Sequence, residues 1–370
     1  MRVGVVLEQC LAPVPGGTGR YAYDLVAALA RTAPQAAEVG TWVGWHRDVA
    51  AAALPGVAGP HRLRMPGRLL PYVWERGRGP APTDVDVVHA PTLLVPPRGP
   101  YALVVTIHDA VPWTHPDLLT TRGVAFHRRM ADRAARDAAL VIVPSAAVRA
   151  ELAAILPAAS RVEVVPPGLT RSLQPPADAD ARAARLGLPS KGFVLSVATL
   201  EPRKGLDVLM AAMAHADGPG LPLVLVGATG WGDVDGSALA AKAGLAASRL
   251  RLLGRVSDAD LAVCYDRATV AVAPSRAEGF GLPVLEAMAA GTPVVTSTAP
   301  ALVEIGGEAV VSVPIGDADA LAHALADLVE DDARRRRLAT AGRARAADFD
   351  GDRSASRLWS LYAEIADARR

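Results

Sequence analysis

Two carboxylates flank a glycine-containing turn in the segment SRAEGFGLPVLEA (275–287). Seven residues, Gly-Phe-Gly-Leu-Pro-Val-Leu, separate Glu278 from Glu286. The β-branched run TVAVAP (269–274) before them predicts a strand, and the proline that follows is typical of the start of a helix, which we expect over 283–290. Glu278 should then lie in the loop and Glu286 in the first helical turn, where each carboxylate can accept hydrogen bonds from a polar ligand.

The turn between that strand and that helix is a candidate anion site. Glycines allow a ligand to approach the backbone closely, and the positive end of the helix dipole favours a negative charge there. The alternative is that Glu286 only stabilises the start of its helix, by about 0.3–1 kcal/mol, with no ligand present. The turn residues that we expect to line the site are Gly279, Phe280, Gly281 and Leu282.

An adjacent pair of cations, Arg203 and Lys204, occurs in LEPRKG (200–205). This segment follows the predicted strand FVLSVA (193–198), so the pair should lie at the carboxyl end of a strand, where ligands bind in open α/β sheets. A nucleoside diphosphate needs such cations, because charge-assisted hydrogen bonds contribute about 1.5–3 kcal/mol each. The alternative is a solvated basic pair beside a helix. Lysine is otherwise rare in this chain and occurs only at Lys191, Lys204 and Lys242.

The N-terminal half contains a glycine-rich loop, PVPGGTGRY (13–21), between the first predicted strand and a helix expected over 20–31. Its glycines fit neither G-x-G-x-x-G nor G-x-x-x-x-G-K-[ST], so the dehydrogenase fingerprint and the kinase P-loop are not matched. Gly16 and Gly17 are therefore candidates for a flexible loop that faces a ligand.

His108 and Asp109 end another strand of the same half, in TIHDAVPW (106–113). A histidine at this position can hydrogen-bond a substrate hydroxyl or a leaving group, and we favour that role for His108. The alternative is an aspartate that stabilises the turn beside a histidine with a structural partner. For His89, also at the end of a strand, we expect the structural role.

Short apolar runs alternate with alanine-rich stretches of helical period, which indicates parallel sheets covered by helices on both faces. The predicted fold class is therefore α/β, with two Rossmann-like domains and an interdomain cleft at the carboxyl ends of their strands. We expect an N-terminal domain at 1–170, a linker at 171–190, a C-terminal domain at 191–350, and a helix at 351–370 that packs back on the N-terminal domain. A further helix is expected at 121–137, and strands at 3–7, 39–44, 85–90, 102–108, 140–145, 193–198, 221–228, 251–254, 269–274, 293–297 and 309–314.

Composition argues against several classes of protein. The 370 residues include 39 basic and 38 acidic side chains, a net charge of +1, so no nucleic-acid-binding surface is indicated. Cys10 and Cys264 are too few for a disulfide framework. The sequence has no C-x-x-C, no H-E-x-x-H and no clustered histidines, so we expect no metal.

Neither a signal peptide nor a run of 18 apolar residues occurs, so we expect a cytoplasmic protein. The basic segment 122–136 suggests contact with an anionic membrane surface, although a solvated helix face is the favoured explanation. The glycine loop GATGWGD (227–233) follows a predicted strand, and it either lines a nucleotide pocket or forms a plain turn.

Taken in order, these motifs resemble family 4 of the retaining glycosyltransferases, mannosyltransferase-like members in particular, which have the GT-B fold. The resemblance covers nearly the whole chain and is carried by GGTGRY, TIHDAVP, VPPGL, ATLEPRKG, LVLVG, RLLGRVSDADL and SRAEGFGLPVLEAMAAGTPVV. It implies transfer of a hexose, with retention, from a nucleotide-diphosphate sugar bound by the C-terminal domain to a hydroxyl acceptor bound by the N-terminal domain. GDP-mannose is the favoured donor, and a glycan, glycolipid or natural product is the expected acceptor.

The resemblance also implies roles for individual residues. Glu278 would contact hydroxyls of the donor sugar, Glu286 would hold the ribose, and the backbone of 279–282 would approach the sugar and phosphates. Arg203 and Lys204 would neutralise the diphosphate. Gly16 and Gly17 would belong to a loop that closes over it, and His108 would lie near the reacting face of the sugar. No dedicated nucleophile and no obligatory metal are implied.

Two departures from the family pattern bear on the phosphate contacts. Ala198 and Thr199 stand where many relatives carry Gly-Arg, and the VPPGL run replaces one with Asn before Gly. Two other functions fit the same motifs: a nucleotide-sugar epimerase of the same fold, and a non-catalytic subunit that binds a sugar nucleotide.

Overall fold

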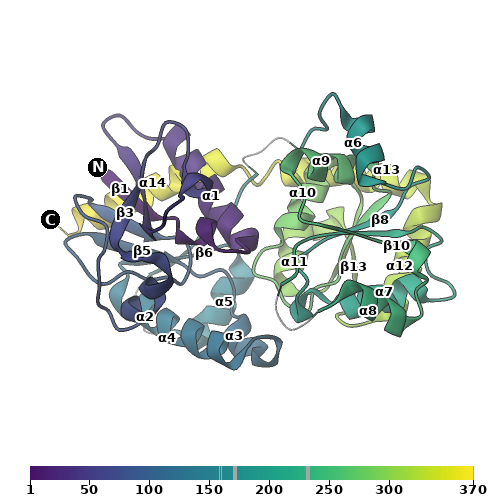
Figure 1. Cartoon of the computed structure of the whole chain (residues 1–370), viewed down its shortest axis with the longest axis horizontal. Coiled ribbons are helices and arrows are strands. Elements are labelled where there is room, and N and C mark those ends of the chain that lie inside the picture. Colours follow the sequence, from purple (N-terminus) through teal and green to yellow (C-terminus); the bar gives the residue numbers. More distant parts are fainter. Residues whose placement is uncertain (158, 160, 170–172, 231–233, 370) are drawn as a thin grey trace. The chain divides into compact units, whose positions relative to one another are not determined.

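The computed structural model describes residues 1–157, 159, 161–169, 173–230 and 234–369. The chain divides into two compact units, of which unit 1 comprises Met1–Thr170 with Phe349–Arg370 and unit 2 comprises Arg171–Asp348. Each unit contains one sheet of parallel strands with helices along both of its faces (Figure 1). The predicted α/β class with two Rossmann-like domains is therefore confirmed.

The sheet of unit 1 has seven strands in the order β3-β2-β1-β4-β5-β6-β7, each parallel to its neighbours. The direction of the strand order reverses between β1 and β4, which makes the loops after these two strands the expected ligand-binding edge. The strands are β1 (Arg2–Val6), β2 (Glu38–Trp45), β3 (Ala58–Pro66), β4 (Val87–Ala90), β5 (Ala102–Thr106), β6 (Leu140–Val143) and β7 (Val162–Val164).

Both faces of this sheet are buried, which explains why its strands are almost continuously apolar. In β6, Leu140 and Ile142 contribute to one core cluster and Val141 and Val143 to the other, because side chains alternate along a strand. One face packs against α1 and α14 and the opposite face against α2, α4 and α5. The helices of unit 1 are α1 (Gly16–Arg31), α2 (Leu70–Trp74), α3 (Val111–Thr114), α4 (Thr121–Asp137), α5 (Ala146–Ile155) and α14 (Gly351–Asp367), with short 3-10 turns at Glu8–Leu11, Ala50–Ala52, Gly67–Leu69 and Pro116–Leu118.

Helix α14 completes unit 1 although it follows all of unit 2 in the sequence. Its Trp359 is buried and donates from Nε1 to the carbonyl oxygen of Leu29 in α1 (3.1 Å). Its Tyr362 hydroxyl lies 2.6 Å from Nδ1 of His89, whose Nε2 lies 2.8 Å from Oγ1 of Thr106. Burial, with a smaller effect of His108, lowers the pKa of His89 to about 3, so His89 is neutral at physiological pH. The structural role expected for His89 is confirmed.

The sheet of unit 2 has six parallel strands in the order β10-β9-β8-β11-β12-β13, which reverses between β8 and β11. Its strands are β8 (Val194–Val197), β9 (Leu223–Val226), β10 (Leu250–Gly254), β11 (Val270–Ala273), β12 (Val294–Ser297) and β13 (Val311–Val313). Its helices are α6 (Ala179–Leu186), α7 (Leu206–Ala214), α8 (Gly236–Ala243), α9 (Asp258–Arg267), α10 (Leu282–Ala290), α11 (Pro300–Gly306), α12 (Ala318–Glu330) and α13 (Asp332–Ala346), with 3-10 turns η5 (Pro202–Lys204), Ala247–Arg249 and Gly307–Ala309.

Several boundaries differ from the sequence prediction. The helix expected over 20–31 begins at Gly16, whereas the one expected at 121–137 is confirmed as α4. Strand β3 was not predicted, because this edge strand is largely exposed and therefore lacks an apolar run. Residues 171–190, which the sequence analysis assigned to a linker, include α6, and α6 packs in unit 2 through an ion pair between Arg182 and Asp260 (2.9 Å).

Helix α4 engages most of its basic side chains within unit 1. Arg128 donates to the carbonyl oxygen of Pro112 (2.7 Å), Arg129 pairs with Glu75, and the buried Arg133 donates to several carbonyl oxygens and to Asp137. These contacts occupy several basic side chains of 122–136, and both explanations of this segment stay predictions. Among the described residues, no helix combines the length and apolar character needed to span a membrane.

Candidate functional site

Two loops meet at the point in unit 2 where the strand order reverses. The loop after β8 carries η5 and ends at Gly205, and the loop after β11 runs from Pro274 to the start of α10. The amide of Arg276 donates to the carbonyl oxygen of Arg203 (2.7 Å), which joins the loops directly. Arg276 also pairs with Asp207 through two contacts of 2.7 and 2.6 Å. Ligands in open α/β sheets bind at such a position.

Gly205 is required for this approach of the two loops. Its φ is +65°, a left-handed conformation that glycine adopts without a steric penalty. A Cβ at this position would lie 2.2 Å from the carbonyl oxygen of Pro274 in the neighbouring loop. A side chain here would therefore separate the two loops that carry the candidate site residues.

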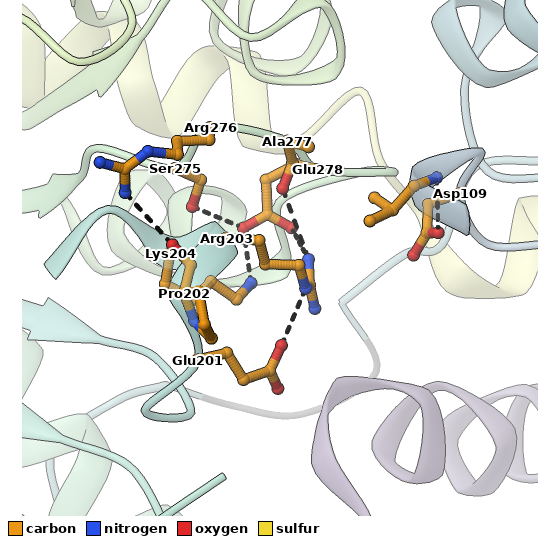
Figure 2. A network of polar contacts seen from close by, with 10 residues as sticks. Asp109, Glu201, Pro202, Arg203, Lys204, Ser275, Arg276, Ala277 and Glu278 are labelled. Carbon is orange, nitrogen blue, oxygen red and sulfur yellow. Dashed lines mark hydrogen bonds and ion pairs between the residues drawn. The ribbon is translucent and has the colours of Figure 1, made fainter. Parts of the chain in front are cut away.

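The structure brings Arg203, Lys204 and Glu278 into one cluster (Figure 2). Lys204 Nζ donates to Oε1 of Glu278 (2.5 Å), and Arg203 Nη1 donates to Oε2 of the same carboxylate (3.2 Å). Ser275 Oγ donates to Oε1 of Glu278 (2.8 Å), and Arg203 Nε donates to Oε2 of Glu201 (2.8 Å). The side chains of Lys204 and Glu278 are only 12% and 10% exposed, so they are held in a partly desolvated environment.

The two cations determine the charge state of Glu278. Burial alone would raise its pKa, but Lys204 and then Arg203 outweigh that effect and lower the pKa to about 2. Burial and the neighbouring Arg203 lower the pKa of Lys204, whereas Glu278 opposes that shift. Glu278 is thus an ionised acceptor throughout the physiological range, and it is surrounded by donors that also suit an anionic ligand.

Glu286 lies outside this cluster, in the second turn of α10 rather than in the first. The helix begins at Leu282, so Glu286 is its fifth residue, and the expectation that it faces the helix dipole in the first turn is wrong. Its side chain is buried, with a residue exposure of 4%, and Oε2 accepts a hydrogen bond from the hydroxyl of Tyr265 (2.8 Å). Tyr265 lies in α9 and was not identified from the sequence. The signal for it was available, because a tyrosine on the buried face of a helix needs a hydrogen-bond partner.

The turn 279–282 is closely packed within unit 2. Gly281 precedes α10 with φ +104°, and an added Cβ would lie 2.6 Å from Cδ2 of Leu302. The ring of Phe280 is buried, and Gly279 is buried too. Pro283 has no N–H and the Val284 amide donates to the carbonyl oxygen of Gly281 (2.9 Å), so α10 offers few amides to an anion. The donor-binding role of Gly279, Phe280, Gly281 and Leu282 stays a prediction.

Gly16 and Gly17 belong to unit 1 and form the first turn of α1. Gly16 has φ +62°, and a Cβ added to either residue would meet nothing within 4 Å. The helical hydrogen bonds of α1 begin at Gly19, whose N–H donates to the carbonyl oxygen of Pro15 (3.0 Å). The first turn of α1 is thus an accessible helix N-terminus of the kind that accommodates anions.

His108 and Asp109 follow β5 in unit 1. His108 Nε2 lies 2.7 Å from the carbonyl oxygen of Pro91, so this nitrogen donates and Nδ1 carries the lone pair. Burial lowers the pKa of His108, which keeps the ring neutral, and its ring packs edge-on against Tyr21. A neutral histidine in this tautomer can accept a hydrogen bond from a hydroxyl group. Asp109 Oδ1 accepts from the amide of Val111 (3.1 Å), which is the turn-stabilising role given as its alternative.

The glycine loop 227–233 is described only up to residue 230, and residues 231–233 lie outside the described part of the chain. A Cβ on Gly227 would lie 1.8 Å from the carbonyl oxygen of Ala198, and Thr229 pairs with Leu200 in an isolated bridge. The described part of this loop therefore packs against residues 198–200, which lead into η5.

Comparison with known proteins finds relatives that cover nearly the whole chain. Residues 15–172 match the family model described as Glycosyltransferase Family 4, and residues 178–345 match Glycosyl transferases group 1. The D-inositol 3-phosphate glycosyltransferase 1 of Catenulispora acidiphila is 32% identical over 405 residues, 99% of this chain and 96% of the relative. The O-antigen chain mannosyltransferase B of Escherichia coli is 29% identical over 282 residues, 75% of this chain and 74% of the relative.

The fold has a similar counterpart among solved structures. The Anabaena protein HepE, solved in complex with UDP and glucose, has a TM-score of 0.74 at 21% identity, covering 98% of this chain and 100% of that protein. Since both family models match and one relative is similar over nearly its whole length, the chain belongs to the group 1, family 4 glycosyltransferases of GT-B fold.

Proposed function

We propose that this glycosyltransferase moves a mannose residue, with retention, from GDP-mannose to a hydroxyl acceptor. The observation that carries the proposal is the Glu278 carboxylate held ionised between Lys204 and Arg203. A sugar nucleotide presents hydroxyl groups beside a diphosphate, and this cluster offers an acceptor and two cations side by side. The mannosyltransferase among the relatives supports the choice of sugar.

In the proposed reaction, the bond between the anomeric carbon and the diphosphate oxygen breaks with both electrons going to the diphosphate. The acceptor oxygen bonds to the anomeric carbon on the same face, and its proton passes to the departing phosphate. Lys204 and Arg203 stabilise the charge that develops on the leaving group, which is the usual source of a large share of catalysis. Glu278 orients the sugar through its hydroxyl groups, and the reaction needs no metal.

His108 stays a predicted catalytic residue, and Gly16 and Gly17 stay predicted donor-binding residues. The neutral ring and unprotonated Nδ1 of His108 support an acceptor role toward a sugar hydroxyl. The open first turn of α1 supports contact of Gly16 and Gly17 with a phosphate. For the acceptor, we propose a hydroxyl group of a glycan, glycolipid or natural product.

A panel of nucleotide sugars tests the proposal directly. Released nucleoside diphosphate is measured with and without acceptor alcohols, and the anomeric configuration of the product is read by NMR. GDP release from GDP-mannose with an α-linked product supports the proposal. Inversion at the anomeric carbon refutes retention, and preference for UDP-glucose, consistent with the UDP complex of HepE, refutes the donor. A changed sugar that remains bound to the nucleotide indicates an epimerase, and no turnover of any donor indicates a binding subunit.

Lys204→Ala should lower the rate of transfer by about 100-fold, since removing one donor to a developing negative charge costs that much in comparable sites. Lys242→Ala, at an exposed position near the end of α8, is the matched control and should keep the activity. Unfolding of both variants is followed by circular dichroism. Equal activity in the two variants rejects the role assigned to Lys204.

A further inference from the structure

A second group of polar side chains lies at the far end of α7 from Lys204. His215 directly follows α7, and the turn after it closes through a hydrogen bond from the amide of Gly218 to the carbonyl oxygen of His215 (3.0 Å). Asp217 lies within this turn. Helix α12 packs on α7 through the apolar core of unit 2 and places Asp319 and His323 one turn apart on the same side. The sequence separates the two histidines widely, and only the fold brings them together.

One ligand atom from each of His215, Asp217 and His323 lies within 4.8 Å of the other two. A tetrahedral zinc ion with ligand distances of about 2.0–2.1 Å needs its ligand atoms about 3.3 Å apart. The remaining difference is small for exposed side chains, and those of Asp217 and His323 are 76% and 58% exposed. Rotation of these two side chains closes part of that distance, and an ion bound at His215 must also replace the hydrogen bond that the amide of Asp217 donates to Nδ1 of His215 (3.1 Å).

Both ring nitrogens of His215 have polar neighbours, and the lone pair that an ion requires is on Nδ1. The amide of Asp217 donates to its Nδ1 (3.1 Å), which identifies Nδ1 as the nitrogen with the lone pair. Its Nε2 then carries the proton and lies 3.6 Å from Oδ1 of Asp319. A metal-bound histidine usually donates its other N–H to a carboxylate, which orients the ring and strengthens it as a ligand. Asp319 is placed for that role.

We propose that His215, Asp217 and His323 form a binding site for a divalent transition metal, with zinc as the ion and Asp319 as the partner of His215. Two imidazoles with one carboxylate favour zinc, nickel or copper over magnesium or calcium, which prefer oxygen ligands. A water molecule completes a tetrahedral set. The nine residues of α7 separate this site from Lys204 by about 13 Å, so the metal stabilises the junction of α7 and α12 and takes no part in transfer.

The test uses the chelator-treated full-length chain and zinc chloride in isothermal titration calorimetry. We expect about one equivalent of zinc at micromolar affinity, and its loss in His323→Gln. Asp319→Asn should weaken binding by about ten-fold, as is usual for a partner of a ligating histidine. His115→Gln, which changes another exposed histidine in unit 1, is the matched control and should bind zinc like the wild type.

Two further readouts separate a metal site from a pair of histidine–aspartate contacts. Cobalt in place of zinc should give visible absorption bands of a four-coordinate ion in the wild type and not in His323→Gln. Zinc should raise the melting temperature of the wild type only, and magnesium should have no effect. Affinity for GDP should be the same in both proteins. Equal zinc affinity in the wild type and His323→Gln, or no binding by the wild type, overturns the proposal.

Discussion

Gly205→Ala tests whether the close approach of the η5 loop to Pro274 builds the donor site. Two effects of the added methyl group can be separated. The left-handed backbone costs about 1 kcal/mol for any residue with a Cβ. The second effect is specific to this position, because the Cβ would lie 2.2 Å from a carbonyl oxygen where about 3.2 Å is needed, so that the loops must separate by about 1 Å.

Gly244→Ala is the matched control for the backbone effect. Gly244 follows α8 as Gly205 follows η5, with φ +78° against +65°, and a Cβ there would meet nothing within 4 Å. In urea titrations, the left-handed backbone should lower the unfolding free energy of both variants by about 1 kcal/mol. Gly205→Ala should lose about 1–3 kcal/mol more, because of the steric clash. Displacement of Lys204 by about 1 Å should also lower turnover about 100-fold, whereas Gly244→Ala should stay fully active. Equal stability and equal turnover of the two variants would refute the steric argument.

The remaining predictions concern the two glutamates. Tyr265→Phe removes the hydroxyl that donates to Glu286 and should raise the dissociation constant of GDP about five-fold, the equivalent of about 1 kcal/mol, in calorimetric titrations. Tyr362→Phe removes a comparable buried hydroxyl from unit 1 and should lower stability while leaving GDP affinity unchanged; a similar change in affinity for both variants would contradict the role of Tyr265. Glu278 should make the protein acid-sensitive: its pKa is about 2 in the folded chain against an ordinary value of 4.5, so its stabilising contribution of about 3 kcal/mol is present above pH 4.5 and is lost as the pH falls toward 2. Glu278→Gln should flatten the dependence of unfolding free energy on pH in that window, and an unchanged slope would argue against the ion pairs.

The sequence predicted most strands and helices because their apolar runs end at turn residues, as in 140–145 and 121–137. It also placed Lys204 and Glu278 after strands. Their direct contact could not be predicted, since it depends on β8 pairing with β11, which is a property of sheet topology. The start of α10 was misjudged by one residue, which makes Glu286 the fifth helical residue instead of the fourth, because a proline is tolerated at either of the first two helical positions.

Contacts between distant parts of the chain could not be predicted from the sequence. Tyr265 and Glu286 lie on different helices, and no local pattern relates a tyrosine in α9 to a carboxylate in α10. The same holds for His215 and His323, whose proximity follows only from the packing of α7 on α12. Strand β3 escaped detection for a different reason, because at the edge of a sheet few of its side chains need to be apolar.

The position of α14 has a consequence for how the protein is made. Domains tend to fold as units while the chain leaves the ribosome, the N-terminal one first. Unit 1 cannot follow this order completely, because the apolar surface that receives Trp359 and Tyr362 stays uncovered until all of unit 2 has been synthesised. During that interval the nascent chain exposes this apolar surface, so the demand for chaperones should be greatest late in translation. A ribosome that stalls within unit 2 should release an aggregation-prone product.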